Sequence, residues 1–269
     1  MKKNTAFTKL SGAGNDFILI AKTLSSQQAS SLAIQLCDRR RAIGADGILL
    51  VSRTPQKSNF RMQYYNSDGS RAFCGNGSRC AAWWLYQKGW AGKNMVLLSD
   101  QGPIPATILG PQLVRIRMPA PKDPRLGIPL HLPGKLWKAH FIHTGVPHAV
   151  VLVKNLQTLS LENYGPPVRY HRAWKPSGAN VDFVELNSSP LRVRTYERGV
   201  EAETLACGTG VTAAALVAHL LGMRSSPVAV RTQSGDTLRV RFHAPTKTLP
   251  REVFLEGPAK ITFEGELPQ

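Results

Sequence analysis

A short motif occurs twice in this chain, and the repetition constrains the fold more than any other sequence feature. Cys-Gly-Asn-Gly begins at Cys74, and Cys-Gly-Thr-Gly begins at Cys207. An alanine-rich stretch follows each motif and ends at a glycine 15 residues after the cysteine, at Gly89 and at Gly222. A glycine in that place is typical of the left-handed residue that ends a helix. We therefore predict two related domains, each with a cysteine at the start of a helix, and not a solenoid of many short repeats.

Other segments extend the repeat. We match GNDFILI (residues 14–20) with NVDFVEL (180–186) through their shared Asp-Phe, and YYN (64–66) with TYE (195–197). The stretch 118–134 contains five prolines, which argue against any regular element and suit a crossing between domains. We predict a first domain over residues 1–118 and a second over 119–257, with 258–269 returning to the first.

Composition sets the broad class of protein. The chain has 269 residues, of which 42% are hydrophobic, enough to build two cores. No apolar run approaches the roughly 18 residues of a membrane span, and no apolar segment follows the N-terminal lysines as in a signal peptide. The four cysteines form neither a Cys-x-x-Cys pair nor a disulfide framework. We expect a soluble, cytoplasmic protein without a membrane partner or a structural metal.

The net charge of +17 has two interpretations. One is binding to nucleic acid or to a membrane surface; the other is a dispersed basic surface without such a partner. The basic clusters are short, as in Arg39–Arg41, and no aromatic residues alternate with them. We favour the dispersed surface and expect no nucleic-acid partner, with steering of a dianionic substrate as a secondary role.

Each repeated motif predicts a reactive thiol. A helix N-terminus carries free N–H groups and a partial positive charge, which lower the pKa of a cysteine placed there. We therefore expect both Cys74 and Cys207 to supply thiolate near neutral pH. The glycines that follow let the backbone approach a ligand, and the exposed N–H groups suit a carboxylate.

Two such thiols suggest one reaction in particular. A carbon between them can lose a proton to one thiolate and gain one from the opposite thiol, which inverts its configuration. The chain shows no further glycine-rich cofactor-phosphate signature and no lysine in a Schiff-base context, so we expect no cofactor. Two alternatives from other classes are a redox sensor that forms a Cys74–Cys207 disulfide and a basic nucleic-acid-binding protein.

Seven motifs together identify a family. In chain order they are SGAGNDF, GADG, YYNSDGS, CGNGSRC, TGVPHAV, GANVDFV and YERGVEAETLACGTG. Nearly from end to end, the chain resembles the diaminopimelate epimerases, of the cofactor-independent amino-acid racemase class. The resemblance implies an α+β fold of two pseudo-symmetric domains, each a β-barrel-like sheet around a central helix, with the active site in the cleft between them. It also implies a homodimer that epimerises LL-2,6-diaminoheptanedioate to the meso form in lysine and peptidoglycan-precursor biosynthesis.

The resemblance also assigns site residues. Cys74 and Cys207 would be the acid/base pair, with His148 and Glu197 as the polar partners that set thiol protonation. The residues that would hold the reacting carboxylate are Gly75, Asn76, Gly208 and Thr209. Those that would bind the distal amino-acid group are Asn15, Asn66, Asn180, Glu197 and Arg198, with Arg198 on its carboxylate.

The sequence departs from the family pattern at two positions, and two relatives of the same fold remain alternatives. Family members often carry Asn where this chain has Val146, and some carry Gln at Gly47. Proline or hydroxyproline racemases typically have Gly-His after the first cysteine, and the phenazine-biosynthesis type lacks the thiol pair. The other cysteines, Cys37 and Cys80, are expected to be packed in the core.

Overall fold

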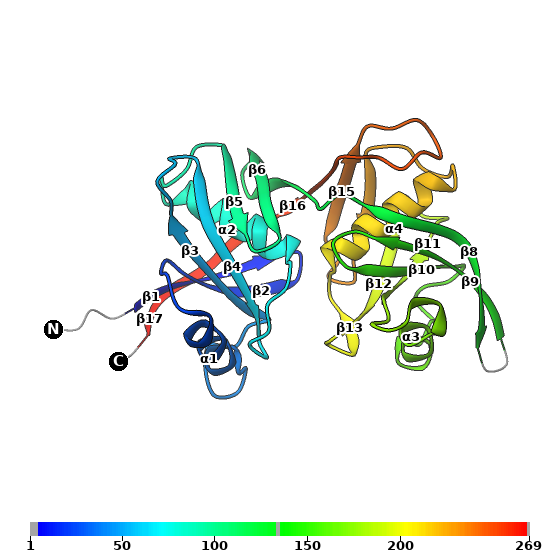
Figure 1. Ribbon diagram of the computed structural model, residues 1–269, viewed down its shortest axis with the longest axis horizontal. Helices are drawn as coiled ribbons and strands as arrows, with labels where there is room; N and C mark the ends of the chain where they lie inside the picture. Colours follow the sequence, from blue (N-terminus) through cyan, green and yellow to red (C-terminus); the bar gives the residue numbers. More distant parts are fainter. Residues whose placement is uncertain (1–4, 133–134, 268–269) are drawn as a thin grey trace. The chain divides into compact units, whose positions relative to one another are not determined.

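The computed structural model describes residues 5–132 and 135–267 (Figure 1). The chain divides into unit 1, Met1–Ile116 with Gly257–Gln269, and unit 2, Arg117–Glu256. These limits lie within two residues of the domain boundaries predicted from the sequence. The C-terminal strand, β17 (Lys260–Leu267), pairs antiparallel with β1 (Thr5–Gly12), so the end of the chain joins its beginning in one sheet.

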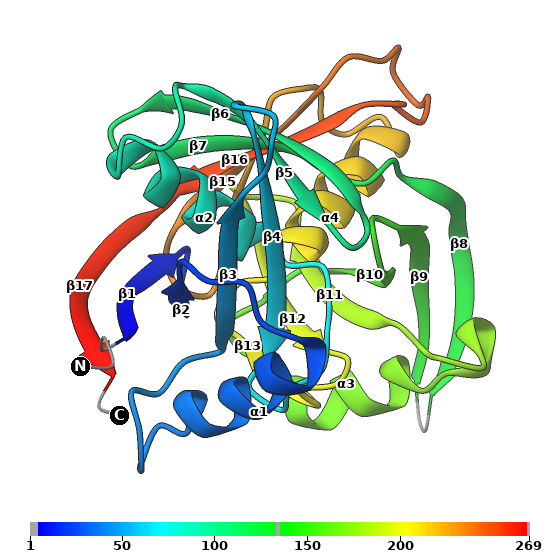
Figure 2. The same cartoon turned by 60° about the vertical axis from the view of Figure 1, so that its left-hand side comes forward.

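Unit 1 is a mixed sheet around one helix. Its other elements are β2 (Asn15–Ile20), α1 (Ser26–Cys37), β3 (Gly47–Arg53), β4 (Asn59–Asn66), α2 (Gly75–Gln87), β5 (Asn94–Ser99), β6 (Gly102–Gly110) and β7 (Leu113–Arg117). The strands pair in the order β17, β1, β2, β3, β4, β5, β6, β7, and the β2–β3 and β4–β5 pairs are parallel. Helix α2 contacts every strand from β17 to β6 in that order, which makes it the central helix (Figures 1 and 2).

Local sequence signals explain both helices of unit 1. Ser25 caps α1 in a capping box, because its hydroxyl accepts the N–H of Gln28 at 3.3 Å while the Gln28 side chain accepts the Ser25 N–H. Helix α2 ends where predicted, with Gly89 just beyond it at φ +66. Trp84 lies in the core of unit 1, where its indole N–H donates to Thr8.

Unit 2 has the same plan. Its elements are β8 (Lys122–Leu132), β9 (Lys135–His143), β10 (Pro147–Val153), α3 (Leu161–Arg169), η1 (Arg172–Trp174), β11 (Asn180–Glu185), β12 (Leu191–Glu197), β13 (Ala202–Thr204), α4 (Gly208–Leu220), β14 (Val228–Arg231), β15 (Thr237–Phe242) and β16 (Val253–Pro258). Helix α4 is buried along its whole length and contacts strands β9 to β12, β14 and β15. The predicted α+β fold with a central helix in each unit is confirmed, and the described strands form open rather than closed sheets.

Strand order defines which elements of the two units are equivalent. Both units contain, in chain order, an antiparallel strand pair, a helix, a parallel strand, an antiparallel strand, the central helix and a further parallel strand. Elements β2, β3, β4 and α2 therefore correspond to β10, β11, β12 and α4. The matches of YYN with TYE and of the two cysteine motifs agree with this order. The match of residues 14–20 with 180–186 is wrong, because 14–20 contains β2 and 180–186 contains β11. The shared Asp-Phe letters fall on non-equivalent strands.

A second expectation is also wrong, since the proline-rich stretch contains strand β8. This strand pairs antiparallel with β9, with register shifts between Lys122 and Arg125 and between Arg125 and Ile128. Pro124 lies within the first irregularity and Gly127, at φ +72, within the second. Bulges tolerate a residue without a ladder N–H, so the prolines bend the strand without abolishing it. Pro133 lies outside the described residues.

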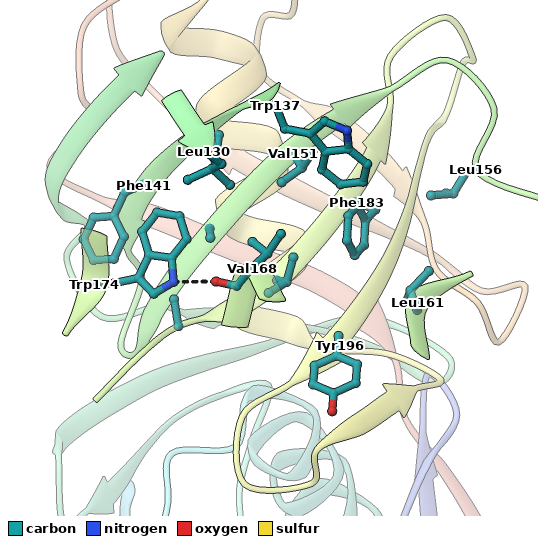
Figure 3. Packing of buried hydrophobic residues seen from close by; sticks show 14 residues of the cluster. Leu130, Trp137, Phe141, Val151, Leu156, Leu161, Val168, Trp174, Phe183 and Tyr196 are labelled. Atoms are coloured by element: carbon teal, nitrogen blue, oxygen red, sulfur yellow. Dashed lines mark hydrogen bonds between the residues drawn. The ribbon is translucent and has the colours of Figure 1, made fainter. Parts of the chain in front are cut away.

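The core of unit 2 is built around aromatic residues (Figure 3). Trp174 stacks on Phe141 with ring centroids 6.3 Å apart, and its indole N–H donates to the carbonyl of Val168 at 2.6 Å. Val168 belongs to α3, a helix that the sequence analysis did not predict. The same cluster includes Val181, Phe183 and the ring of Tyr196, so it fixes β11 and β12, which carry the predicted site residues Asn180 and Glu197.

Candidate active site

Cys74 begins helix α2 and is half-buried. It is the N-cap residue, with φ −129 and ψ 103, and its sulfur accepts the backbone N–H of Gly77 at 3.3 Å. A pocket of about 60 Å³ lies beside it, lined among others by Tyr64, Arg71 and Asp100. Cys74 therefore faces an accessible space at a helix N-terminus, where free N–H groups favour a negative charge.

Two predicted substrate residues of unit 1 are joined by a hydrogen bond. The Asn76 amide donates to Asn15 Oδ1 at 2.6 Å, and the Asn15 amide donates to Asp46 Oδ2 at 2.8 Å. On its other side, Asn76 Oδ1 accepts a hydrogen bond from the buried Arg79 at 2.9 Å. This chain fixes both asparagine side chains next to the start of α2. Gly75, the third predicted residue, is the first residue of that helix.

Asn66 ends strand β4. Its Oδ1 accepts the Tyr64 hydroxyl at 2.8 Å, and its amide donates to Ser70 Oγ at 2.9 Å. In the register of the sheet Asn66 lies opposite Gly47, at the end of β4 that leads towards the Cys74 motif. The structure thus places Asn66 in the segment that leads from β4 to α2.

Cys207 begins helix α4 with nearly the same backbone, φ −121 and ψ 109, but in a different environment. Only 8% of the residue is exposed, and its sulfur lies 3.2 Å from the hydroxyl of Thr209. Burial raises the pKa of the Cys207 thiol well above its ordinary value, and the charges of Glu197 and Asp182 raise it further. The expectation of a lowered pKa is therefore wrong for Cys207, because desolvation outweighs the helix N-terminus. Gly208 and Thr209 form the first turn of α4 beside it.

The predicted residues of β10, β11 and the turn after β12 form one hydrogen-bonded group. The backbone N–H of Arg198 donates to Asn180 Oδ1 at 2.7 Å, and the Asn180 amide lies 3.4 Å from His148 Nε2. His148 Nδ1 lies 2.7 Å from Asp182 Oδ2. His148 is fully buried and Asn180 nearly so, hence both side chains are fixed inside unit 2.

Glu197 and Arg198 follow each other at the end of β12. Glu197 is half-buried and contributes to the raised pKa of Cys207, so its carboxylate acts on the thiol electrostatically. The pKa of Arg198 is lowered by burial and then by the charge of Arg169. Arg169 itself donates to Glu201 at 3.1 Å. Arg198 is therefore a partly buried guanidinium near the Arg169–Glu201 ion pair, and a guanidinium is a group that can bind a carboxylate.

The sequence analysis missed Asp182, which belongs to this group, and Thr195, which is hydrogen-bonded to it. Asp182 is fully buried in β11, and its Oδ1 accepts the Thr195 hydroxyl at 2.8 Å. The available signal was a lone acidic residue within the apolar run Val181–Val184, because a buried strand seldom carries a charge without a partner. The partner, His148, is distant in sequence and becomes adjacent only through the parallel pairing of β10 and β11.

The remaining cysteines do not belong to either site. Burial raises the pKa of Cys80 to about 12 and that of Cys37 to about 12, so both thiols stay protonated. Both are buried in unit 1, as predicted. Within residues 5–132 and 135–267, no group of three or more His, Cys, Asp or Glu side chains is arranged to hold a metal ion. None of the helices in those ranges is long and apolar enough to cross a membrane.

Comparison with solved structures defines the class of fold. A probable proline racemase from Agrobacterium radiobacter matches with a TM-score of 0.76, 15% identity and coverage of 98% of this chain and 93% of that one. A hydroxyproline epimerase from Agrobacterium vitis matches with a TM-score of 0.74 and 15% identity over 99% of this chain and 93% of that one. The two-unit fold, with a central helix in each unit, is that of the proline-racemase class of proteins.

Sequence comparison then gives the family. The model of the family described as "Diaminopimelate epimerase" matches residues 7–119 and 140–262. A diaminopimelate epimerase from Chlorobaculum tepidum is 40% identical over 96% of this chain and 99% of its own length. Another from Aquifex aeolicus is 38% identical over 97% of each chain. The chain belongs to the diaminopimelate epimerase family and is an enzyme of the isomerase class.

Proposed function

We propose that this protein interconverts LL- and meso-2,6-diaminoheptanedioate without a cofactor, as a step of lysine and peptidoglycan-precursor biosynthesis. The observation that carries the proposal is the pair of cysteines, each the N-cap of the central helix in one of two equivalent units and each followed by Gly-x-Gly. The relatives that bear the name diaminopimelate epimerase support the choice of substrate. We further propose a cytoplasmic location and a homodimer.

In the proposed reaction, one sulfur acts as base and the other as acid. The thiolate of one cysteine takes the α-proton, and the electron pair of the broken C–H bond delocalises into the substrate carboxylate. The thiol of the other cysteine then donates its proton to the opposite face of the carbon, so configuration inverts and the number of protons is conserved. Cys74 and Cys207 exchange these roles with the direction of reaction.

The first turns of α2 and α4 stabilise the carbanion. Backbone N–H groups at Gly75, Asn76, Gly208 and Thr209 hold the reacting carboxylate, where negative charge develops in the transition state. Because these donors are fixed by the helices, they need little reorganisation during the reaction.

The distal end of the substrate provides specificity. Arg198 binds the distal carboxylate, and the residues that complete the distal site are Asn15, Asn66, Asn180 and Glu197. His148 is fully buried and lies 3.4 Å from Asn180, so its role in this proposal is to act through its neighbours. A site that pairs both an ammonium and a carboxylate rejects amino acids with a single amino-acid end.

Exchange with solvent tests the proposal. The protein is incubated under reducing conditions with LL-diaminopimelate in deuterated water, and the α-hydrogens are followed by NMR. We expect loss of the α-hydrogen signal together with appearance of the meso isomer. Proline and trans-4-hydroxyproline serve as control substrates and should not exchange. Absence of exchange with LL-diaminopimelate would refute the proposed activity, whereas exchange with proline alone would assign the racemase alternative.

A further inference from the structure

Three buried positions beneath the helix turns are aliphatic or aromatic in unit 1, whereas in unit 2 they are an imidazole, a carboxylate and a hydroxyl. The strand registers pair Leu49 with Tyr64 across β3 and β4, and Asp182 with Thr195 across β11 and β12. On the neighbouring parallel strands, Phe17 lies beside the start of β3 and His148 beside the start of β11. The equivalent sets are therefore Phe17, Leu49 and Tyr64 in unit 1 and His148, Asp182 and Thr195 in unit 2.

The fold itself does not require a polar group at these positions. In unit 1 they hold a buried leucine and an edge-to-face aromatic pair, Phe17 with Tyr64, whose ring centroids are 5.9 Å apart. In unit 2 the equivalent residues are at most 3% exposed and include a carboxylate. Burying a charge is unfavourable unless it is paired and hydrogen-bonded. The polar residues at these positions of unit 2 must therefore have a role other than stabilising the fold.

The hydrogen bonds of this cluster favour one tautomer of His148. Asn180 Oδ1 accepts the Arg198 N–H, which turns the amide N–H₂ of Asn180 towards His148 Nε2. Nε2 is then an acceptor, so the proton of the neutral imidazole is on Nδ1 and is donated to Asp182. Asp182 accepts from His148 and from Thr195, as an ionised carboxylate does.

Gly210 brings this charge against the Cys207 turn. A Cβ added to Gly210, the third residue of α4, would lie 2.2 Å from Asp182 Oδ1, so the carboxylate touches the backbone of the first helical turn. At the equivalent Gly77 of unit 1, the nearest atom to such a Cβ is Leu49 Cδ2 at 3.0 Å. The same contact is therefore made by a methyl group under Cys74 and by a carboxylate under Cys207.

We propose that Asp182 is a positioning residue that fixes His148 and holds a buried negative charge against the first turn of α4, so that Cys207 is protonated in the resting enzyme. The two thiols of the proposed reaction then start unequal, with Cys207 as the acid. This inference rests on the proposed function for its catalytic meaning, but the charge effect itself exists without substrate.

Other ionisable groups lie on the strands that pack against α4. Those whose side chains are described are Lys138, His140 and His143 of β9, His148 of β10, Glu185 of β11, Arg192, Arg194, Tyr196 and Glu197 of β12, Arg231 of β14, and Arg239 and Arg241 of β15. The acidic groups that raise the pKa of Cys207, after burial itself, are Glu197 and Asp182. Of these two, only Asp182 is completely buried, so its charge is the less screened by solvent.

Alkylation kinetics test the proposal without substrate. The full chain and its Asp182→Asn variant are treated with iodoacetamide at a series of pH values, and peptide mass spectrometry gives the rate at each cysteine. Since thiolates react and thiols do not, the midpoint of each pH profile reports thiol protonation. We expect the Cys207 midpoint to fall by about one unit in the variant and the Cys74 midpoint to stay unchanged.

A surface substitution provides the matched control. Glu162→Gln removes an exposed acid of the same unit, in the first turn of α3, and should move neither midpoint. An unchanged Cys207 midpoint in Asp182→Asn would overturn the proposal, as would an equal fall at both cysteines, which indicates general loosening. Exchange of diaminopimelate by the wild-type protein is measured separately. Failure of the proposed function would appear in that exchange, whereas failure of the charge effect would appear in the alkylation midpoints.

A measurement on the wild-type protein covers the case in which Asp182→Asn does not fold. Long-range proton–nitrogen NMR of ¹⁵N-histidine-labelled protein distinguishes the imidazole tautomers. We expect the proton of His148 on Nδ1, facing Asp182, because the Asn180 amide N–H₂ faces Nε2. A proton on Nε2 would overturn the assignment.

Discussion

The turns that begin with Cys74 and Cys207 have the same backbone but different surroundings. Both cysteines are N-cap residues in the extended region, and both are followed by Gly-x-Gly at the start of a central helix. Cys74 is half-buried and accepts the Gly77 N–H, whereas Cys207 is buried and lies next to the Thr209 hydroxyl. The duplication thus preserves the geometry of the turn, while the strands beneath it determine how easily each sulfur loses its proton.

The largest expected effect comes from removing either sulfur. Cys74→Ser and Cys207→Ser should each lower the rate of diaminopimelate exchange by about 10³-fold or more, because a hydroxyl is a far weaker acid than a thiol. Exchange in deuterated water measures both. Cys37→Ala, in the core of unit 1, is the control, and the fraction of this variant that folds should retain activity. Near-normal turnover in either serine variant would exclude a two-base mechanism.

A pair of glycine substitutions tests the packing difference beneath the turns. A Cβ at Gly210 would lie 2.2 Å from a carboxylate oxygen, whereas one at Gly77 would lie 3.0 Å from the end of a leucine side chain, which can move. We expect Gly210→Ala to lower the free energy of unfolding by about 2 kcal/mol or more. Gly77→Ala should change it by less than about 1 kcal/mol, because alanine also favours the helix. Urea unfolding compares them, and equal losses would contradict the proposed difference.

The sequence predicted the features that depend on local pattern. The C-terminal glycine of α2 and the duplicated cysteine turns both follow from residues adjacent in the chain. The pairing of the repeats failed at Asp16 and Asp182, since identical letters can fall on different strands. Which face a strand residue occupies depends on register, and register is set by partners far away in sequence. The His148–Asp182 contact was invisible for the same reason.

The acid of β2 in unit 1, Asp16, contrasts with Asp182. Burial raises its pKa, but hydrogen bonds from Arg39 and Lys9 outweigh burial, so the net shift is downwards. The Lys9 ammonium lies 2.7 Å from Asp16 Oδ2, and the carboxylate is 22% exposed. Its charge is therefore neutralised by cations, whereas the groups that contact the Asp182 carboxylate are the His148 imidazole and the Thr195 hydroxyl.

A carboxyl group with a lowered pKa stabilises the folded state above its ordinary pKa and loses that contribution as pH falls through the folded value. We therefore expect Asp16→Asn to lower the free energy of unfolding at pH 7 and to match the wild type more closely near pH 3. Urea unfolding at the two pH values measures the difference. An equal loss at both would show that the Asp16 charge contributes nothing and that the substitution acts through packing alone.

The smallest expected effect concerns the hydroxyl beside Cys207. The hydrogen bond between the sulfur and Thr209 lowers the pKa of the thiol, against the larger effect of burial and of the acidic groups. Thr209→Val removes the hydroxyl and keeps the backbone N–H of the helix turn. The Cys207 alkylation midpoint should therefore rise slightly, opposite in sign to the fall expected for Asp182→Asn. The alkylation profile of Cys74 should not change in this variant, because the equivalent position of unit 1 is Asn76, which the substitution leaves in place. A fall in the Cys207 midpoint would mean that solvent access, and not the balance of local charges and hydrogen-bond donors, controls the protonation of the thiol.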